Sequence, residues 1–307
     1  MLDAALLGTG GMMPLPGRFL TSLLLRFGGR LVMVDCGEGT QVTLKMLGWG
    51  YKNLDAICFT HFHADHISGL PGLLLSVGNS GREEPITLIG PPGMGLVARS
   101  LCIIAQELPF EVNIAELPYE RGSAPQQIKL GDFIISVLAA DHRIPCFSYT
   151  FEFKRAGRFD VEKAKLNGVP IQAWNRLQKY ETLELDGRRF TPDMVLGPPR
   201  TPIKLAYCTD TRPVRELPEF IKNADLFICE GLYGDPDMLA KTAAHKHMLF
   251  QEAAGIARAG CVDELWLTHF SPAMAFPENF INTARSIFPN SYIGKDRMNR
   301  TVNYRDE

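Results

Sequence analysis

Several signals that would assign a function to a chain at first sight are missing from these 307 residues. The seven cysteines are scattered and form no CxxC pair, which argues against a disulfide framework or a cysteine-rich zinc finger. No apolar run reaches the ~18 residues that cross a bilayer, so we expect no membrane association. Neither a Walker A motif nor a GxGxxG between a strand and a helix is present, so we expect no nucleotide cofactor.

The bulk composition is ordinary. The chain is 46% hydrophobic and 21% charged, and its formal net charge is −2 at pH 7. These values indicate a globular protein without an overall nucleic-acid signal. Scattered cysteines in apolar runs are typical of buried thiols in a reducing compartment, so we expect a cytoplasmic protein.

The chain does contain three histidines and one aspartate within six residues. The stretch HFHADH, residues 61–66, directly follows an apolar run. Imidazole and carboxylate groups are ligands that Zn²⁺ prefers in proteins. His61 and His63 point the same way in an extended segment and suit one ion, whereas Asp65 and His66 can reach a second. Two ions roughly 3.5–4 Å apart stabilise the attacking and leaving oxygens in hydrolysis.

Strands alternate with helices along most of the chain, which predicts a layered α/β fold. We expect strands at residues 2–7, 21–27, 30–35, 55–60, 85–90, 133–139, 148–153, 203–208, 226–230 and 264–268, and helices at 41–47, 67–77, 93–108 and 248–259. Four of the strands end in a metal-capable residue, and such ends meet in α/β scaffolds. The pattern predicts one metal held by His61, His63 and His142, a second held by Asp65, His66 and His269, and Asp210 between them.

Residues 154–200 break this alternation. They contain ten Lys or Arg residues and six Asp or Glu residues, and they lack a long apolar strand. The segment is therefore predicted to be a partly ordered excursion from the core. Its charge alone is equally compatible with a solvated surface and with a nucleic-acid-binding segment.

The motifs closely resemble those of the metallo-β-lactamase superfamily and, within it, the ribonuclease Z family. The resemblance covers nearly the whole chain and rests on HxHxDH with a distal His, Asp and His, on DCGEGTQ at 35–41, and on THFHADHISGLPGLL at 60–74. It implies a four-layer αβ/βα sandwich formed by residues 1–307 as a single domain. It also implies that residues 154–200 are an inserted flexible arm, an exosite that binds tRNA away from the active site.

The resemblance further implies the chemistry of the site. Two Zn²⁺ per subunit, with Mn²⁺ or another divalent ion as the alternative, would be bound by His61, His63, Asp65, His66, His142, Asp210 and His269. Asp65 would also orient the attacking hydroxide, and His247 paired with Glu230 would protonate the leaving oxygen. His245 is left without a role and is expected at the surface. The implied substrate is precursor tRNA, which one subunit of a homodimer clamps while the other removes its 3′ trailer.

An alternative function remains open at this stage. The segment VPIQAW at 169–174 departs from the Pro-Pro-Gly-Pro-like turn of the family's arm. A phosphodiesterase of the same fold, acting on small or cyclic phosphodiesters, is therefore the alternative to an endoribonuclease. A non-catalytic RNA-binding protein has no need of seven ligands, and a β-lactam or thioester hydrolase has no need of the Glu230–His247 pair.

Overall fold

The computed structural model describes residues 1–131, 133–155, 157–179, 181–198 and 200–305. By the density of its internal contacts the chain divides into two units. The main unit comprises residues 1–151 and 204–303, and the smaller unit comprises residues 152–203 together with the C-terminal residues from Tyr304. Within the described residues, no helix combines the length and apolar character needed to span a membrane.

The first sheet of the main unit has the strand order β16-β1-β2-β3-β4-β5-β6. β1, β2 and β3 are antiparallel neighbours, whereas β3 to β6 pair in parallel. The turn at Gly28-Gly29, where both residues have positive φ, joins β2 to β3. The bounds are β1 Leu2–Gly8, β2 Ser22–Phe27, β3 Arg30–Val34, β4 Leu54–Cys58, β5 Ile86–Gly90, β6 Val112–Glu116 and β16 Asn299–Val302.

The second sheet has the order β15-β14-β13-β12-β9-β8-β7. β12 to β15 are parallel, so their carboxyl ends lie at one edge of the sheet. The bounds are β7 Gln126–Leu130, β8 Phe133–Ala139, β9 Phe147–Arg155, β12 Arg200–Cys208, β13 Leu226–Glu230, β14 Leu265–Thr268 and β15 Ser291–Ile293.

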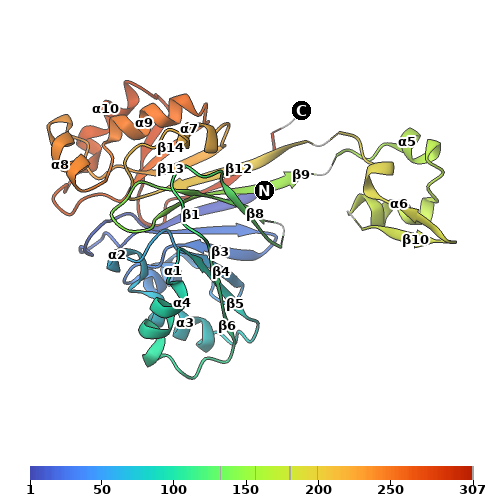
Figure 1. Ribbon diagram of the computed structural model, residues 1–307, viewed down its shortest axis with the longest axis horizontal. Helices are drawn as coiled ribbons and strands as arrows, with labels where there is room; N and C mark the ends of the chain where they lie inside the picture. Colours follow the sequence, from blue (N-terminus) through green and yellow to red (C-terminus); the bar gives the residue numbers. More distant parts are fainter. Residues whose placement is uncertain (132, 156, 180, 199, 306–307) are drawn as a thin grey trace. The chain divides into compact units, whose positions relative to one another are not determined.

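Helices cover the outer face of each sheet, so the main unit is a four-layer αββα sandwich (Figure 1). The first sheet packs against α1 Thr40–Leu47, α3 Leu70–Asn79 and α4 Met94–Leu101. The second sheet packs against α7 Leu217–Phe220, α9 Phe250–Ala259 and α10 Ile281–Arg285. The central strands, such as β1, β3 and β13, are buried on both faces, which is why they read as continuous apolar runs. Two short helices, α2 Ala64–Ile67 and α8 Leu239–Ala244, lie in the connections.

Two of the expected helices differ from the structure. The expected helix at 67–77 is replaced by α2 and α3, which are separated by Ser68 and Gly69. A Cβ on Gly69 would lie 2.1 Å from the carbonyl oxygen of Gly37, so this junction requires glycine. The expected helix at 93–108 ends as α4 at Leu101 and continues only as a short 3₁₀ turn over Cys102–Ile104. Ile103 and Ile104 are exposed, so burial of these two side chains adds nothing to the stability of a longer helix.

The smaller unit contains its own elements and its own apolar cluster. α5 Val161–Leu166 and α6 Ile171–Gln178 precede the hairpin of β10 Leu183–Leu185 and β11 Arg188–Phe190. Its buried side chains are Ala164, Val169, Ala173, Leu177, Leu183, Phe190, Val195 and Leu196. The predicted excursion thus has more local order in its described residues than its mixed composition indicated.

Candidate active site

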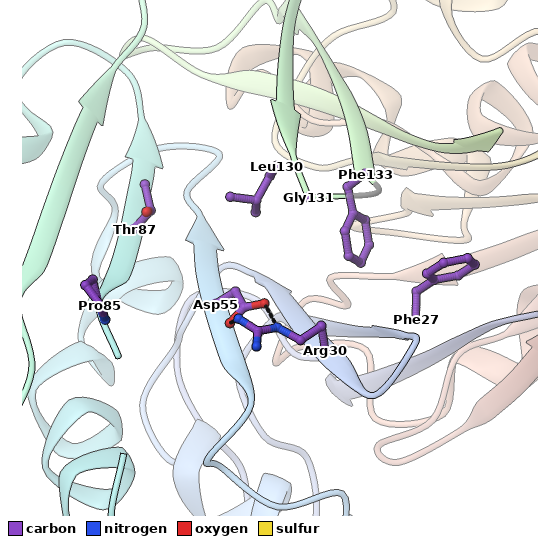
Figure 2. Close-up of a pocket in the computed structure, with 8 residues that line it drawn as sticks. All are labelled: Phe27, Arg30, Asp55, Pro85, Thr87, Leu130, Gly131 and Phe133. Atoms are coloured by element: carbon purple, nitrogen blue, oxygen red, sulfur yellow. Dashed lines mark hydrogen bonds and ion pairs between the residues drawn. The ribbon is translucent and has the colours of Figure 1, made fainter. Parts of the chain in front are cut away.

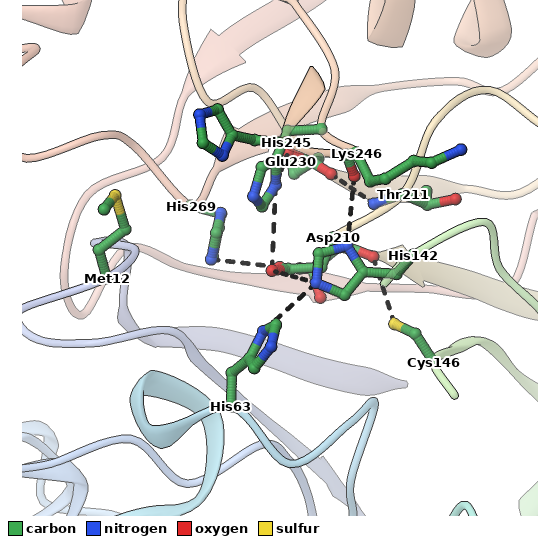
Figure 3. A network of polar contacts seen from close by, with 12 residues as sticks. Met12, His63, His142, Cys146, Asp210, Thr211, Glu230, His245, Lys246 and His269 are labelled. Atoms are coloured by element: carbon green, nitrogen blue, oxygen red, sulfur yellow. Dashed lines mark hydrogen bonds and ion pairs between the residues drawn. The ribbon is translucent and has the colours of Figure 1, made fainter. Parts of the chain in front are cut away.

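Side chains from the ends of several strands converge at one edge of the two sheets. His61 and His63 follow β4, Asp210 follows β12, and His269 follows β14. Figure 3 shows His63, His142, Asp210 and His269 approaching one another from different elements. Because parallel strands place their carboxyl ends together, residues more than 200 positions apart in sequence become neighbours here.

The first set of metal-capable side chains is His61, His63, His142 and Asp210. Nε2 of His61 lies 3.0 Å from Nδ1 of His63, which lies 3.3 Å from Nε2 of His142. Oδ2 of Asp210 lies 3.6 Å from the His61 nitrogen and 3.7 Å from the His142 nitrogen.

The second set is Asp65, His66 and His269, and it also meets Asp210. Nε2 of His66 and Nε2 of His269 lie 3.2 Å apart. Oδ2 of Asp65 lies 3.6 Å from the first and 3.4 Å from the second. Oδ1 of Asp210 lies 3.3 Å and 3.2 Å from the same two nitrogens, so Asp210 faces each set with a different oxygen.

These separations fit a metal ion at the centre of each set. Ligands of a tetrahedral ion with bonds of ~2.0–2.1 Å lie about 3.3–3.4 Å from one another. Ring nitrogens that face one another at such distances repel through their lone pairs unless a cation or proton lies between them. Oδ1 of Asp210 is buried and has no donor in hydrogen-bonding geometry among the described residues. The donor set is therefore suited to divalent ions.

A buried carboxylate behind the site orients one histidine of each set. Asp35 accepts hydrogen bonds from the amide and the hydroxyl of Thr60, both at 2.8 Å, and lies 2.8 Å from Nδ1 of His66. The Thr60 hydroxyl lies 3.0 Å from Nδ1 of His61. A proton on each Nδ1 is thereby held, and each Nε2 presents its lone pair to the site. No pattern in the sequence alone predicts a role for Asp35 or Thr60, although Asp35 also ends an apolar strand.

His247 and Glu230 form a second pair beside the ligands. Nδ1 of His247 lies 3.0 Å from Oε2 of Glu230, and the other carboxylate oxygen accepts the amide of Thr211 at 2.7 Å. Glu230 is fully buried at the end of β13. Arg212 donates to the backbone carbonyl of His247 and pairs with Glu252, which fixes the segment that carries the imidazole.

Burial and neighbouring charges shift the pKa values of several side chains in the site. Burial alone would raise the pKa of Asp65 and of Asp210, but the surrounding imidazoles lower both. Burial alone would lower the pKa of His66, yet the carboxylates of Asp210, Asp35 and Asp65 raise it well above its usual value. Burial also opposes a proton on His247, but Glu230 and Asp210 outweigh it and raise the pKa of His247 to about 9. The site therefore combines anionic carboxylates with a histidine that holds its proton near neutral pH.

The backbone at the strand ends is held in an uncommon conformation. Asp35, Asp210 and His269 all have positive φ, at 58°, 47° and 59°. Such values are rare for residues with a side chain. They occur most often at functional sites, where the surrounding structure holds the backbone in a strained conformation. A Cβ on Gly11 would lie 2.7 Å from the His269 ring, so this position leaves room only for glycine.

The structure brings together all seven residues of the predicted metal set, and it places Glu230 and His247 beside them. The exposed His245 lies outside the set, and its Nδ1 is 3.1 Å from Nη2 of Arg143. All seven cysteines are free, and five of them are buried.

A separate hollow of about 380 Å³ contains none of these residues (Figure 2). Its floor is the ion pair of Arg30 with Asp55, and Phe27 and Phe133 meet edge to face at its side. Its charged groups already neutralise each other, so the hollow offers no chemistry comparable with the His and Asp cluster.

Known proteins resemble this chain over its whole length. Ribonuclease Z of Lachnoclostridium phytofermentans is 51% identical over 305 residues, which cover 99% of both chains. Ribonuclease Z of Clostridium kluyveri is 51% identical over 306 residues, which cover 100% of both. A family model described as anti-Pycsar protein Apyc1 matches residues 2–94.

Solved structures share the fold. The short form of human tRNase Z superposes with a TM-score of 0.70 at 23% identity, covering 98% of this chain and 99% of that one. The metallo-β-lactamase fold protein YhfI from Bacillus subtilis gives a TM-score of 0.69 at 19% identity, covering 98% and 100%. The αββα sandwich described above is therefore a metallo-β-lactamase fold.

Proposed function

The chain belongs to the ribonuclease Z family, and we propose that it is a metal-dependent endoribonuclease that removes the 3′ trailer of precursor tRNA. Identity of 51% over the full length of proteins named ribonuclease Z supports this substrate. The observation that carries the chemistry is the pair of donor sets that share Asp210, with His247 directly beside them.

We propose two metal ions per subunit, Zn²⁺ in the first place and Mn²⁺ or another divalent ion as the alternative. The first would be bound by His61, His63 and His142, the second by Asp65, His66 and His269, and Asp210 would bridge them. Such ions, when bound, lower the pKa of water toward roughly 7 and neutralise the charge of a phosphodiester. Imidazole and carboxylate donors without cysteine are typical of catalytic rather than structural zinc sites.

The protein residues then control the protons. Asp65 would orient the attacking oxygen, and its low pKa keeps it an acceptor at neutral pH. A new bond from that oxygen to phosphorus replaces the bond from phosphorus to the 3′ oxygen of the mature tRNA. His247, held through Nδ1 by Glu230, would donate the proton on its other nitrogen to the departing oxygen. The products are a 3′-hydroxyl on the tRNA and a 5′-phosphate on the trailer.

The smaller unit would supply affinity rather than chemistry. We propose that residues 154–200 are an exosite that holds tRNA phosphates through Lys and Arg side chains. In this proposal the enzyme acts as a homodimer in the cytoplasm, with one subunit holding the tRNA that the other cleaves. Arg188 and Arg189 on β11 and Lys179 after α6 are exposed basic residues of this unit.

A phosphodiesterase that acts on small or cyclic phosphodiesters is the second candidate, because the same donors suit any phosphodiester.

The test is to strip the protein of metal, reload it with Zn²⁺ or Mn²⁺, and assay a precursor tRNA beside bis-p-nitrophenyl phosphate. Metal-dependent cleavage of the precursor is the expected result. Turnover of the small diester without precursor cleavage would favour the second candidate, and no turnover of either would contradict both.

A further inference from the structure

A hollow of about 350 Å³ opens directly beside His247, and the proposed cleavage of the phosphodiester does not involve it. Its volume lies within the roughly 300–1,000 Å³ of small-ligand sites. Met12, Met13 and Tyr233 supply apolar walls, and Lys241, His245 and His247 supply the polar groups. Figure 3 shows His245 and Met12 next to the converging ligands.

The walls are suited to a flat apolar group. Met12 and Met13 are 65% and 58% exposed, and thioether side chains adapt to planar ligands. Tyr233 is buried and fixed by a 3.1 Å hydrogen bond between its hydroxyl and that of Ser271. The ammonium of Lys241 lies 5.3 Å from the centre of the Tyr233 ring and adds positive charge to the same wall.

The position of His245 defines its hydrogen-bonding role. Nη2 of Arg143 lies 3.1 Å from Nδ1 of His245, and a guanidinium group can only donate. Nδ1 of His245 is therefore the acceptor, and the proton of the neutral ring lies on Nε2. Arg143 is itself held by the carbonyl of Ala244 at 2.9 Å. Lys241 and His245 thus both offer donors to the hollow, whereas the Tyr233 and Ser271 hydroxyls already bond each other. This arrangement suits a ligand that carries acceptor atoms.

We propose that this hollow binds the nucleobase of the last nucleotide of the mature tRNA, with Met13 and Tyr233 as packing surfaces and His245 as the donor that selects the base. The assignment rests on the proposed function. His247 would protonate the 3′ oxygen of that nucleotide, so its ribose lies at the rim of the hollow that His247 lines. A base attached to the same ribose reaches the hollow without crossing the metal-ligand cluster.

The test uses two panels of precursors with wild-type protein, Met13→Ala and His245→Ala. One panel varies the nucleotide before the cleaved bond, and the other varies the first nucleotide of the trailer. Met46→Ala is the matched control, because Met46 is 59% exposed on α1 and lies outside the hollow. Metal content and turnover of bis-p-nitrophenyl phosphate report whether each variant keeps its fold and its site.

We expect the ratio of kcat/KM for the precursor to that for the small diester to fall roughly 2- to 10-fold in Met13→Ala. His245→Ala is expected to lose a similar, roughly 2- to 10-fold preference among bases in the first panel only. The proposal would be overturned if neither variant changed the ratio of kcat/KM values or the preference among bases. It would also be overturned if the variants changed only the preference for the first nucleotide of the trailer. Failure of wild-type protein to cleave any precursor would instead contradict the proposed function.

Discussion

In the proposed function, the Glu230–His247 pair would donate a proton without being part of the metal-ligand set. Glu230 is fully buried and has one oxygen on the imidazole and the other on the Thr211 amide. A carboxylate fixed in this way stabilises the imidazolium form, which is the form that can act as a general acid.

Replacing His247 with Ala is therefore expected to lower kcat for precursor tRNA by roughly 10²–10⁴-fold. The metal content should stay at the wild-type level, because His247 is not among the seven proposed ligands. Elemental analysis beside single-turnover kinetics checks both statements. Loss of metal from the variant would mean that His247 is a ligand rather than an acid.

Glu230 also sets the pH at which His247 loses its proton. Because the pKa of His247 is raised to about 9, its contribution as an acid is present below that pH and is lost as the pH rises through it. Glu230→Gln removes the largest raising contribution, so the alkaline limb of the kcat profile should move to lower pH. A pH profile of the variant with an unmoved alkaline limb would show that the limb belongs to another group.

Asp35 is expected to control metal affinity without touching a metal. Asp35→Asn replaces one carboxylate oxygen with an NH₂ group, so the uncharged side chain can no longer accept through both oxygens from Thr60 and His66. Loss of such an outer partner typically lowers metal affinity about 10–100-fold. Competition with a zinc chelator measures the change, and Asp3→Asn, which alters a carboxylate paired with Arg26, serves as the control. Equal affinity in Asp35→Asn and wild-type protein would contradict this role.

The residues that the sequence could identify are those with a recognisable pattern. HxHxDH and the strand-ending His142, Asp210 and His269 predict seven metal-capable residues, and the structure brings these residues together. Asp35 and Thr60 were missed because their roles depend on contacts across the fold, such as Asp35 with His66. The positive φ of Asp210 and His269 likewise follows from the geometry of the strand ends, and no local pattern in the sequence predicts it.

At the scale of the elements, buried strands were easier to predict than edge strands. β4 and β14 are mostly apolar and buried, and both were expected close to their actual bounds. β12 was expected only over its buried second half, at 203–208, because its first residues are polar or proline. β6 and β7 alternate between partly buried and exposed residues at or near the sheet edges, and they were not expected. Their pairing is stabilised by neighbouring strands rather than by their own side chains.

The proposed exosite in the smaller unit leads to a prediction about how its basic residues affect tRNA binding. In the proposed exosite, Lys179→Ala with Arg189→Ala should raise KM for precursor tRNA and reduce the salt slope of its binding by up to about 2. The small diester should be turned over at the wild-type rate, because neither residue belongs to the main unit.

The matched control removes two exposed basic residues of the main unit, Lys45→Ala with Lys129→Ala. An equal rise in KM in both double variants would argue for general charge attraction rather than an exosite in residues 154–200.

At the scale of the whole molecule, the donor sets join the two sheets of the sandwich. His66 follows the first sheet, and Asp210 and His269 end strands of the second. Ions bound to the folded state alone stabilise it, by about 3–4 kcal/mol at 100 to 1,000 times Kd. Chelation should therefore lower the thermal midpoint by about 5–10 °C, which calorimetry with and without added Zn²⁺ measures. An unchanged midpoint would contradict a metal shared by the two sheets.

In the proposed function, the main unit hydrolyses the bond after the last nucleotide of the mature tRNA. Mapping both product ends from a precursor with a 3′ trailer, cleaved by metal-loaded protein, is the decisive measurement. We expect a tRNA that ends in a 3′-hydroxyl at the last nucleotide before the trailer, and a trailer that begins with a 5′-phosphate. Cleavage at scattered positions, or an intact precursor while bis-p-nitrophenyl phosphate is turned over, would contradict it.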